Sequence, residues 1–204
     1  MKISIKRKKV LIIPGLSDKG NWVKLATSWW SYYGIDTYIH SVGWQDNNSI
    51  GSFSKALDSI IKISKNLADR DPITIVGISA GGSAAFNTLL EIPSSVDRAI
   101  SICGRLRKGN HQRRSLEKRS EKSIKFKESV LQFENQEPLI PADFRKRFMT
   151  VSAKFGDELV PSDTSFLAGA YNLQIPTIEH LLSISLGLII FSKSILNFIR
   201  FGKP

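Results

Sequence analysis

The sequence predicts an α/β fold in which a mostly parallel sheet is flanked by helices. Short apolar segments alternate along the chain with longer segments of helical periodicity, which is the pattern of a parallel sheet with crossover helices. Segment 72–79, PITIVGIS, is apolar almost throughout, as a strand in the middle of such a sheet must be. The 204 residues suit one domain spanning 1–204, and no internal repeat is visible.

The first third of the chain predicts two strands and two helices. Segment 9–15, KVLIIPG, is expected to be a strand that ends at a Pro-Gly turn, and 35–44 a second strand. A helix is expected over 21–34, ending at Gly34, because apolar residues recur there at helical spacing: Trp22, Leu25, Ala26, Trp29, Trp30 and Tyr33. A second helix is expected within 49–71, with one apolar face: Phe53, Leu57, Ile60, Ile61 and Leu67.

The rest of the chain continues the alternation. After the strand at 72–79 we expect a helix over 80–92, a strand over 96–104, a basic helical segment, strands starting near 147 and 173, and a long final helix over 180–201. That helix carries one apolar stripe: Ile184, Leu188, Phe191, Ile195 and Phe198. Four further apolar residues lie off the stripe: Leu182, Leu186, Ile189 and Ile190. If they are exposed, they are expected to form a hydrophobic surface for a lipid or a partner.

Composition narrows the class of protein. The apolar run Val10 to Ile13 is too short for a secretory core, and polar residues interrupt 180–201, so neither end is expected to act as a signal or a membrane span. Cys103 is the only cysteine, which excludes an internal disulfide and favours a cytoplasmic location. The net charge of +11 favours anionic partners, and an anionic membrane surface to which the protein binds peripherally is among them.

A serine between glycines at a strand-to-helix junction is the most informative motif. Gly77-Ile78-Ser79-Ala80-Gly81 comes directly after the buried strand and directly before a helix, which is the context of a nucleophile elbow. The tight turn would hold the Ser79 hydroxyl above the sheet at the positive end of the helix. Ser79 is therefore the candidate nucleophile.

A nucleophilic serine needs a base and an acid that orients the base. His180, between the last strand and the last helix, is the natural base; His111 lies among charges and is expected to be solvated, and His40 is expected to be structural or to line the pocket. The acid is sought in SAKFGDELVPSDTS, which offers Asp157, Glu158 and Asp163. Asp157 is favoured because it follows a strand and a Phe-Gly turn, while Asp163 could instead cap a helix.

These motifs, in this order, resemble those of the α/β-hydrolase superfamily. The resemblance rests on VLIIPGL, GISAGG, FGDELVP and TIEH and covers nearly the whole chain, which looks like a minimal, esterase- or lipase-like member. It implies Ser79 as nucleophile, Asp157 as acid and His180 as base. It also implies an oxyanion hole made by the backbone N–H groups of Ala80 and Leu16, a pocket near Gly15, Ser17 and His40, and no metal or cofactor.

The resemblance further implies a helical lid over the site at 104–143. The stretch from Arg105 to Lys127 holds ten Lys and Arg residues against Glu117 and Glu121. As a lid it would attract anionic substrates or lipid surfaces; as a solvated helix it would only keep the protein soluble. It lacks interleaved aromatic residues, which argues against binding nucleic acid.

Two classes of function remain open at this level. The first is a serine hydrolase that cleaves a small acyl ester, thioester or lipid through a Ser-His-Asp triad and an acyl-enzyme. The second is a non-catalytic protein of the same fold that binds at an anionic or lipid surface. A complete set of nucleophile, base and acid favours the first.

Overall fold

Six parallel strands form a single sheet, which confirms the predicted fold class. The computed structural model describes residues 7–18, 20–45 and 53–204. Every strand pair is parallel, and the strand order is β2-β1-β3-β4-β5-β6. The strands are β1 (Lys8–Ile13), β2 (Ile35–Ile39), β3 (Ile73–Ile78), β4 (Val96–Ile102), β5 (Phe148–Ala153) and β6 (Tyr171–Ile175).

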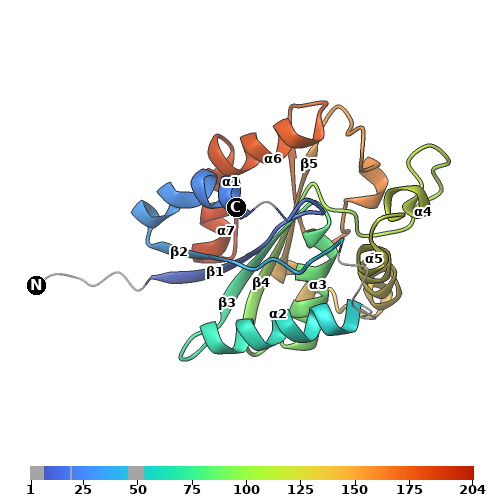
Figure 1. Ribbon diagram of the computed structural model, residues 1–204. Coiled ribbons are helices and arrows are strands. Elements are labelled where there is room, and N and C mark those ends of the chain that lie inside the picture. The colour runs from blue at the N-terminus through green and yellow to red at the C-terminus, as the bar shows by residue number, and fades with distance from the viewer. Residues whose placement is uncertain (1–6, 19, 46–52) are drawn as a thin grey trace, which may run out of the picture.

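Helices cover both faces of the sheet (Figure 1). One face carries α1 (Gly20–Thr27), α6 (His180–Ile189) and α7 (Ser192–Phe201), and the other carries α2 (Phe53–Leu67), α3 (Gly81–Glu91) and α5 (Ile124–Gln136). The short α4 (Leu116–Arg119) lies beyond the carboxyl ends of the strands, beside α5. Helices on both faces are what a parallel sheet requires, because each of its faces is apolar.

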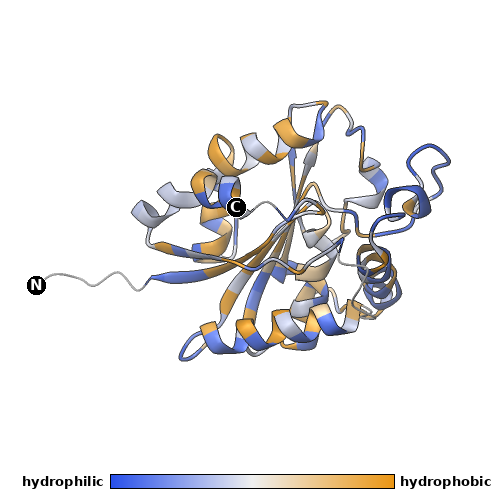
Figure 2. Cartoon of the chain, in the orientation of Figure 1, coloured by the Kyte–Doolittle hydropathy of each residue, from blue (hydrophilic) through white to orange (hydrophobic). Residues whose placement is uncertain are grey.

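The sheet separates two apolar cores, and β3 contributes to both. All six residues of β3 are buried, and Ile75 packs with α2, α3 and α5 while Val76 packs with α1, α6 and α7. Aromatic rings fill the first core, where Phe86 lies with its centroid 4.7 Å from that of Phe148. Figure 2 shows the contrast between the apolar strands and the hydrophilic segment around α4. The predicted face of α2 is buried or half-buried as expected, with Phe53, Leu57 and Ile60 fully inside.

The helix predicted over 21–34 is interrupted. Its α-helical part ends at Thr27, and Ser28–Tyr33 forms a tighter 3₁₀ helix that ends, as predicted, at Gly34 in a left-handed conformation with φ of 73°. The tighter turn places Trp30 wholly inside, where its indole N–H donates to the carbonyl of Leu188 at 3.2 Å. Leu25, part of the expected apolar pattern, is instead exposed.

The single final helix predicted over 180–201 is two helices. The chain bends by 57° between α6 and α7, because the amide of Phe191 donates to the carbonyl of Leu186 and so forms a wider turn, and the Ser192 hydroxyl donates to Ile189. No single helix among the described residues has the length and composition to cross a membrane; only this bent pair, taken together, does. The predicted stripe is nevertheless buried against the sheet, with Ile184, Leu188, Ile195 and Phe198 almost inaccessible.

Three of the four residues predicted to lie off that stripe are exposed. Leu182, Ile189 and Ile190 are about half exposed or more, while Leu186 packs partly against the core. Their role as a surface for a lipid or a partner stays a prediction.

The strand order determines where a site can form. The chain runs from β1 to β2 on one side, then crosses back over β1 to β3 and continues outward to β4 on the other side. The strand order therefore reverses between β1 and β3, which is the switch point at which ligands bind in open α/β sheets. The loop Pro14-Gly15-Leu16 follows β1, and Ser79 follows β3. Both lie at the carboxyl edge of the sheet, and so do the segments that follow β4, β5 and β6.

Candidate active site

Ser79 occupies a strained turn between β3 and α3. Its φ of 52° lies in the left-handed region that side chains other than glycine rarely adopt. The flanking glycines make the turn possible: a Cβ on Gly77 would lie 2.0 Å from the carbonyl oxygen of Gly81, and one on Gly81 would lie 2.3 Å from the carbonyl oxygen of Ile13. The strand and the helix therefore meet closely, and the Ser79 hydroxyl lies at their junction at the edge of the sheet.

Gly77→Ala is expected to destabilise the protein by about 3 kcal/mol or more, because the added methyl group meets backbone atoms that cannot move without opening the turn. Equilibrium unfolding in urea measures this loss. Gly20→Ala is the matched control, since its added Cβ approaches only the movable Ile39 side chain, at 3.1 Å. An unchanged midpoint for Gly77→Ala would show that the turn is looser than its contacts indicate.

His180, the first residue of α6, faces Ser79. Its Nε2 lies 2.9 Å from the Ser79 Oγ, and the side chain is 2 % exposed. Two carboxylates fix the start of the helix: Glu179 caps it by accepting from the amides of Leu181 and Leu182, and Glu158 accepts from the amide of His180 at 2.9 Å. The imidazole is therefore held at the helix end and points toward the serine.

Asp157 lies on the other side of the imidazole. Its Oδ2 is 2.7 Å from Nδ1 of His180, and its Oδ1 accepts from the amides of Leu159 and Val160 at 2.8 and 2.9 Å. Burial alone would raise the pKa of Asp157, but the hydrogen bond and charge of His180 and the two amides together hold the pKa below its usual range. Asp157 is therefore an ionised acceptor for the imidazole.

The other acid and base candidates lie elsewhere. Asp163 pairs with His111, with 2.8 Å between its Oδ1 and the histidine Nε2, and does not cap a helix as proposed, since Pro161 holds the cap position of that turn. His111 is thus half-buried and in hydrogen-bond contact with Asp163, and is not a freely solvated side chain. His40 does not line the pocket: its Nε2 lies 3.0 Å from the Ser59 Oγ on the side of β2 and α2.

The backbone N–H groups of Ala80 and Leu16 are the predicted oxyanion donors. Within residues 7–18, 20–45 and 53–204, neither the amide of Ala80 nor that of Leu16 donates a hydrogen bond, and both residues line the cavity at Ser79. Gly15 brings the loop this close, because a Cβ there would lie 3.0 Å from that of Ser79. Ser17 is exposed and does not line the cavity, contrary to expectation.

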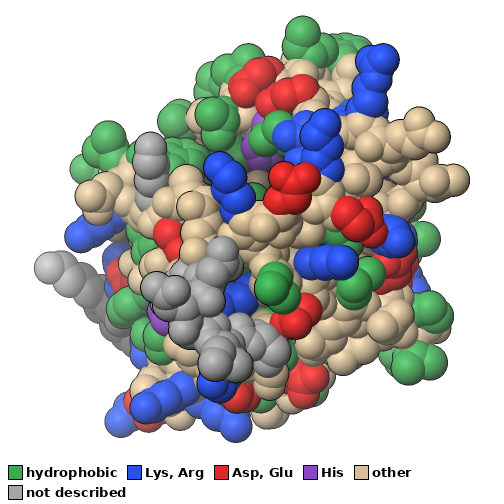
Figure 3. Space-filling model, turned by 45° about the vertical axis from the view of Figure 1, so that its right-hand side comes forward, with side chains coloured by type: hydrophobic (Ala, Val, Ile, Leu, Met, Phe, Trp, Pro, Cys, Tyr) green, Lys and Arg blue, Asp and Glu red, His purple; other side chains and the backbone are tan. Residues whose placement is uncertain are grey.

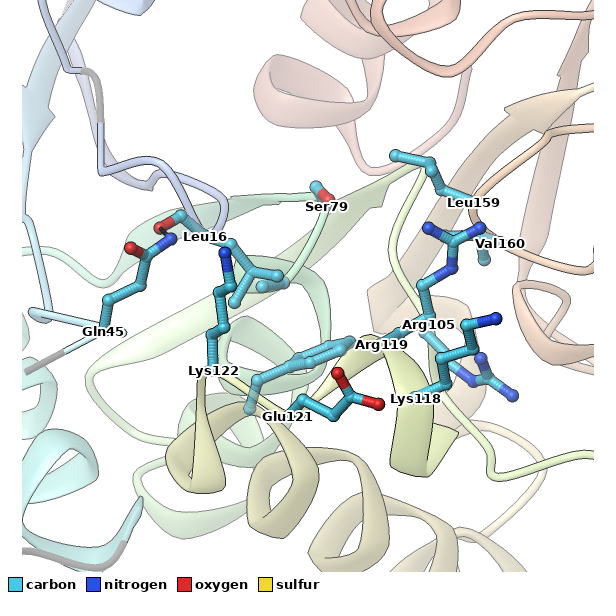
Figure 4. Close-up of a pocket in the computed structure, with 12 residues that line it drawn as sticks. Leu16, Gln45, Ser79, Arg105, Lys118, Arg119, Glu121, Lys122, Leu159 and Val160 are labelled. Carbon is cyan, nitrogen blue, oxygen red and sulfur yellow. Dashed lines mark hydrogen bonds between the residues drawn. The ribbon is translucent and has the colours of Figure 1, made fainter. Parts of the chain in front are cut away.

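A cavity of about 240 Å³ opens beside Ser79 (Figure 4). Its wall is formed by the loop after β1 (14–16), Gln45, the turn that carries Ser79, the basic segment, and the loop 154–161 that carries Asp157, which we call the acid loop. The lining residues are Leu16, Gln45, Ser79, Ala80, Arg105, Lys118, Arg119, Glu121, Lys122, Phe126, Leu159 and Val160. Seven of these twelve were not named individually as site residues: Gln45, and six from the segment 104–143 that was expected to cover the site, namely Arg105, Lys118, Arg119, Glu121, Lys122 and Phe126.

Arginines of the basic segment hold it against the acid loop. Arg114 donates to the carbonyl of Asp157 at 2.6 Å, and Arg119 donates to that of Glu158 at 3.0 Å. Arg105 is 1 % exposed, and its guanidinium donates to the carbonyls of Arg107, Lys108 and Arg114. The segment is therefore more than a solvated helix; whether it acts as a lid stays a prediction.

Arg114→Gln is expected to lower kcat by about tenfold with little change in KM, because a carbonyl contact of the loop that carries Asp157 is lost and small displacements of catalytic groups are costly. Steady-state kinetics on a neutral ester measures the effect. Arg113→Gln is the control, since Arg113 is exposed and makes the same change of charge. Equal kcat values for the two variants would remove any positioning role from Arg114.

Cys103 lies beside the acid and base. Ligand atoms of Cys103, Asp157 and His180 lie within 4.8 Å of one another, a spacing compatible with a metal ion. Burial, followed by the charge of Asp157, raises the pKa of the thiol well above its usual value, so the sulfur stays protonated. Asp157 and His180 are already hydrogen-bonded to each other. The donor set therefore suits a hydrogen-bonded acid–base pair better than a metal site.

Several solved structures share this architecture. One, from work on the metagenome-derived lipolytic enzymes LipS and LipT, superposes with a TM-score of 0.67 at 14 % identity, covering 96 % of this chain and 94 % of the other. A monoacylglycerol lipase from Paleococcus ferrophilus gives 0.65 at 13 % identity, covering 98 % and 97 %. Est1E from Butyrivibrio proteoclasticus gives 0.63 at 14 % identity, covering 97 % and 88 %.

Sequence comparisons add no relative. No family profile matches the chain, and no curated protein matches it. The likeness is thus one of fold, and it extends over nearly the whole length of both chains.

Proposed function

We propose that this chain, which has the α/β-hydrolase fold, is a serine hydrolase that cleaves carboxylic esters through an acyl-enzyme. The observation that carries the proposal is the continuous path from Ser79 Oγ through the two nitrogens of His180 to Asp157, with steps of 2.9 and 2.7 Å. The lipolytic names of the structural neighbours agree with ester or lipid substrates.

Acylation begins when the Ser79 oxygen attacks the ester carbonyl carbon. His180 Nε2 takes the hydroxyl proton, and Asp157 holds the other ring proton at Nδ1 and stabilises the imidazolium that forms. The carbonyl oxygen becomes an oxyanion between the N–H groups of Ala80 and Leu16, and each such donor typically contributes ~3 kcal/mol. The tetrahedral intermediate then collapses, the bond to the alcohol oxygen breaks, and His180 gives its proton to that oxygen.

Deacylation repeats these steps with water. His180 removes a proton from the water that attacks the acyl carbon, the oxyanion forms again between the same donors, and collapse releases the acid and restores the Ser79 hydroxyl. A thioester can follow the same course, because only the leaving atom differs.

The alternative of a non-catalytic binding protein is less consistent with this geometry. A binding surface gains nothing from a strained serine, an aligned histidine and a buried ionised carboxylate, and backbone strain of this kind costs ~1–3 kcal/mol. The strain at Ser79 is therefore better explained by catalysis.

A fluorophosphonate probe tests the proposal directly. The intact protein should be labelled on the peptide that contains Ser79, and a panel of 4-nitrophenyl esters of rising acyl length should be hydrolysed. Absence of both labelling and hydrolysis in folded protein would favour the binding alternative.

A further inference from the structure

The cavity beside Ser79 has a strongly positive wall. Four cationic residues line it, all from the basic segment: Arg105, Lys118, Arg119 and Lys122. Among the described residues that line the cavity, Glu121 is the one carboxylate. Figure 3 shows the molecule with this side brought forward, where Lys and Arg side chains lie interspersed with carboxylates.

Two of these cations are already engaged in holding the protein together. The guanidinium of Arg105 is used by three backbone carbonyls. Arg119 donates one N–H to the carbonyl of Glu158, while its Nε is buried and has no partner among the described residues. Arg119 therefore keeps one buried donor that is unsatisfied in the absence of a ligand.

The two lysines are free to bind a ligand. Lys118 and Lys122 are exposed, and neither side chain forms an ion pair or a hydrogen bond within the part of the chain that the structure describes. Lys122 extends toward the edge formed by Leu16 and Ser79 (Figure 4). Its ammonium is thus placed to reach a group attached to an ester at the serine.

The remaining walls are apolar and the space is small. Leu16, Phe126, Leu159 and Val160 offer hydrocarbon surface, and the cavity of about 240 Å³ suits a short chain rather than a bulky one. A substrate in this cavity would therefore contact both an apolar wall and a cationic wall.

We propose that the substrate is a small soluble ester that carries an anionic group, a carboxylate, sulfonate or phosphate, which Lys118 and Lys122 bind while the hydrocarbon part lies on the apolar wall. The inference rests on the proposed ester hydrolysis at Ser79 and specifies its substrate class. Because the anionic group lies away from the reacting carbonyl, it contributes similarly before and during the reaction, so the preference should appear in KM more than in kcat.

Two pairs of esters of matched size test the inference. One pair places the charge on the leaving group: 4-(butanoyloxy)benzenesulfonate against 4-(butanoyloxy)benzenesulfonamide. The other places it on the acyl chain: the mono-4-nitrophenyl ester of adipic acid against 4-nitrophenyl hexanoate, with non-enzymatic hydrolysis subtracted. In at least one pair we expect kcat/KM to be about tenfold higher for the anionic ester, a difference typical of a charged contact.

Lysine variants assign the preference to the cavity. Lys118→Gln combined with Lys122→Gln should bring the ratio of anionic to neutral kcat/KM close to one. Lys62→Gln, which removes one positive charge from the exposed side of α2, should keep the ratio. Repeating the assay at 0.5 M salt, where the Debye length falls to about 4 Å, should reduce the ratio only in part, since direct contacts are screened less than distant charges.

The outcomes separate this inference from the proposed function. Equal kcat/KM within both pairs, or a preference that survives the double lysine variant or is lost equally in Lys62→Gln, would overturn the anionic substrate while leaving ester hydrolysis intact. Failure to hydrolyse any ester, with no labelling of Ser79, would instead remove the proposed function itself.

Discussion

Ser79→Ala is expected to abolish fluorophosphonate labelling and to lower ester hydrolysis by on the order of 10⁶-fold, as loss of the nucleophile does in serine proteases. The physical reason is the loss of the Ser79 Oγ, the proposed nucleophile, which lies 2.9 Å from His180 Nε2. The Ala80 and Leu16 amides and the cavity stay in place, so some acceleration over water should remain. The measurement is turnover of a neutral 4-nitrophenyl ester together with mass spectrometry of the labelled peptide.

The control for Ser79→Ala is a measurement that the variant is folded. Alanine has the same Cβ as serine, so it meets the same backbone strain at a φ of 52°. The circular dichroism spectrum and the melting temperature should therefore stay close to those of the unmodified protein. Ser17→Ala is a matched variant, because Ser17 is exposed and lies near the same edge without lining the cavity. Retained hydrolysis in folded Ser79→Ala protein would end the assignment of Ser79 as nucleophile.

Much of the fold could be predicted because its signals are local. The apolar segment 72–79 and its glycine-flanked serine predict β3, the turn and the start of α3 from neighbouring residues alone. The bend between α6 and α7 could not be predicted, because no residue type there enforces a break in the helix. The bend depends on the hydrogen bond from the amide of Phe191 to the carbonyl of Leu186. The 3₁₀ turn at 28–33 likewise follows from the burial of Trp30 against α6.

Some residues of the candidate site could likewise be predicted from the sequence, and others could not. The order of Ser79, Asp157 and His180 along the chain, each after a strand, indicated that the three would meet at one edge of the sheet, and the structure brings them together. The role of Arg114 and Arg119 could not be predicted, because their acceptors are backbone carbonyls of Asp157 and Glu158, which leave no mark in the sequence.

The contacts of the arginines change the interpretation of the charge of the basic segment. Counting ten cationic residues suggested a general attractive field, but several arginines are used internally. Only a few cations, chiefly Lys118 and Lys122, remain at the cavity to bind a ligand. Attraction of anions therefore depends on where charges point more than on their number, and replacing Arg114 or Arg119 would disturb the acid loop as well as the field.

Asp157→Asn is expected to lower kcat by about 10⁴-fold, as loss of the orienting carboxylate does in serine proteases. The asparagine carbonyl can still accept from the amides of Leu159 and Val160, so the loop should keep its shape. Its NH₂ group would then face His180 Nδ1 and donate to it, which moves the ring proton to Nε2. In this tautomer the neutral imidazole carries its proton on Nε2, so Nε2 cannot accept the Ser79 proton. The serine then stays inactive although the three side chains are in place.

Asp163→Asn is the matched comparison, because it makes the same change in the same segment. Asp163 contacts His111 and has no contact with His180, and its side chain is 62 % exposed, so kcat should change less than twofold. Steady-state kinetics on one neutral ester, with the melting temperature of each variant, ranks the two carboxylates. A large loss for Asp163→Asn with near-normal turnover for Asp157→Asn would move the acid to Asp163 and require His180 to turn away from Asp157. The 2.7 Å contact between buried, mutually oriented groups argues for the first ranking, since an ionised carboxylate held by two amides is a fixed acceptor and a surface carboxylate is not.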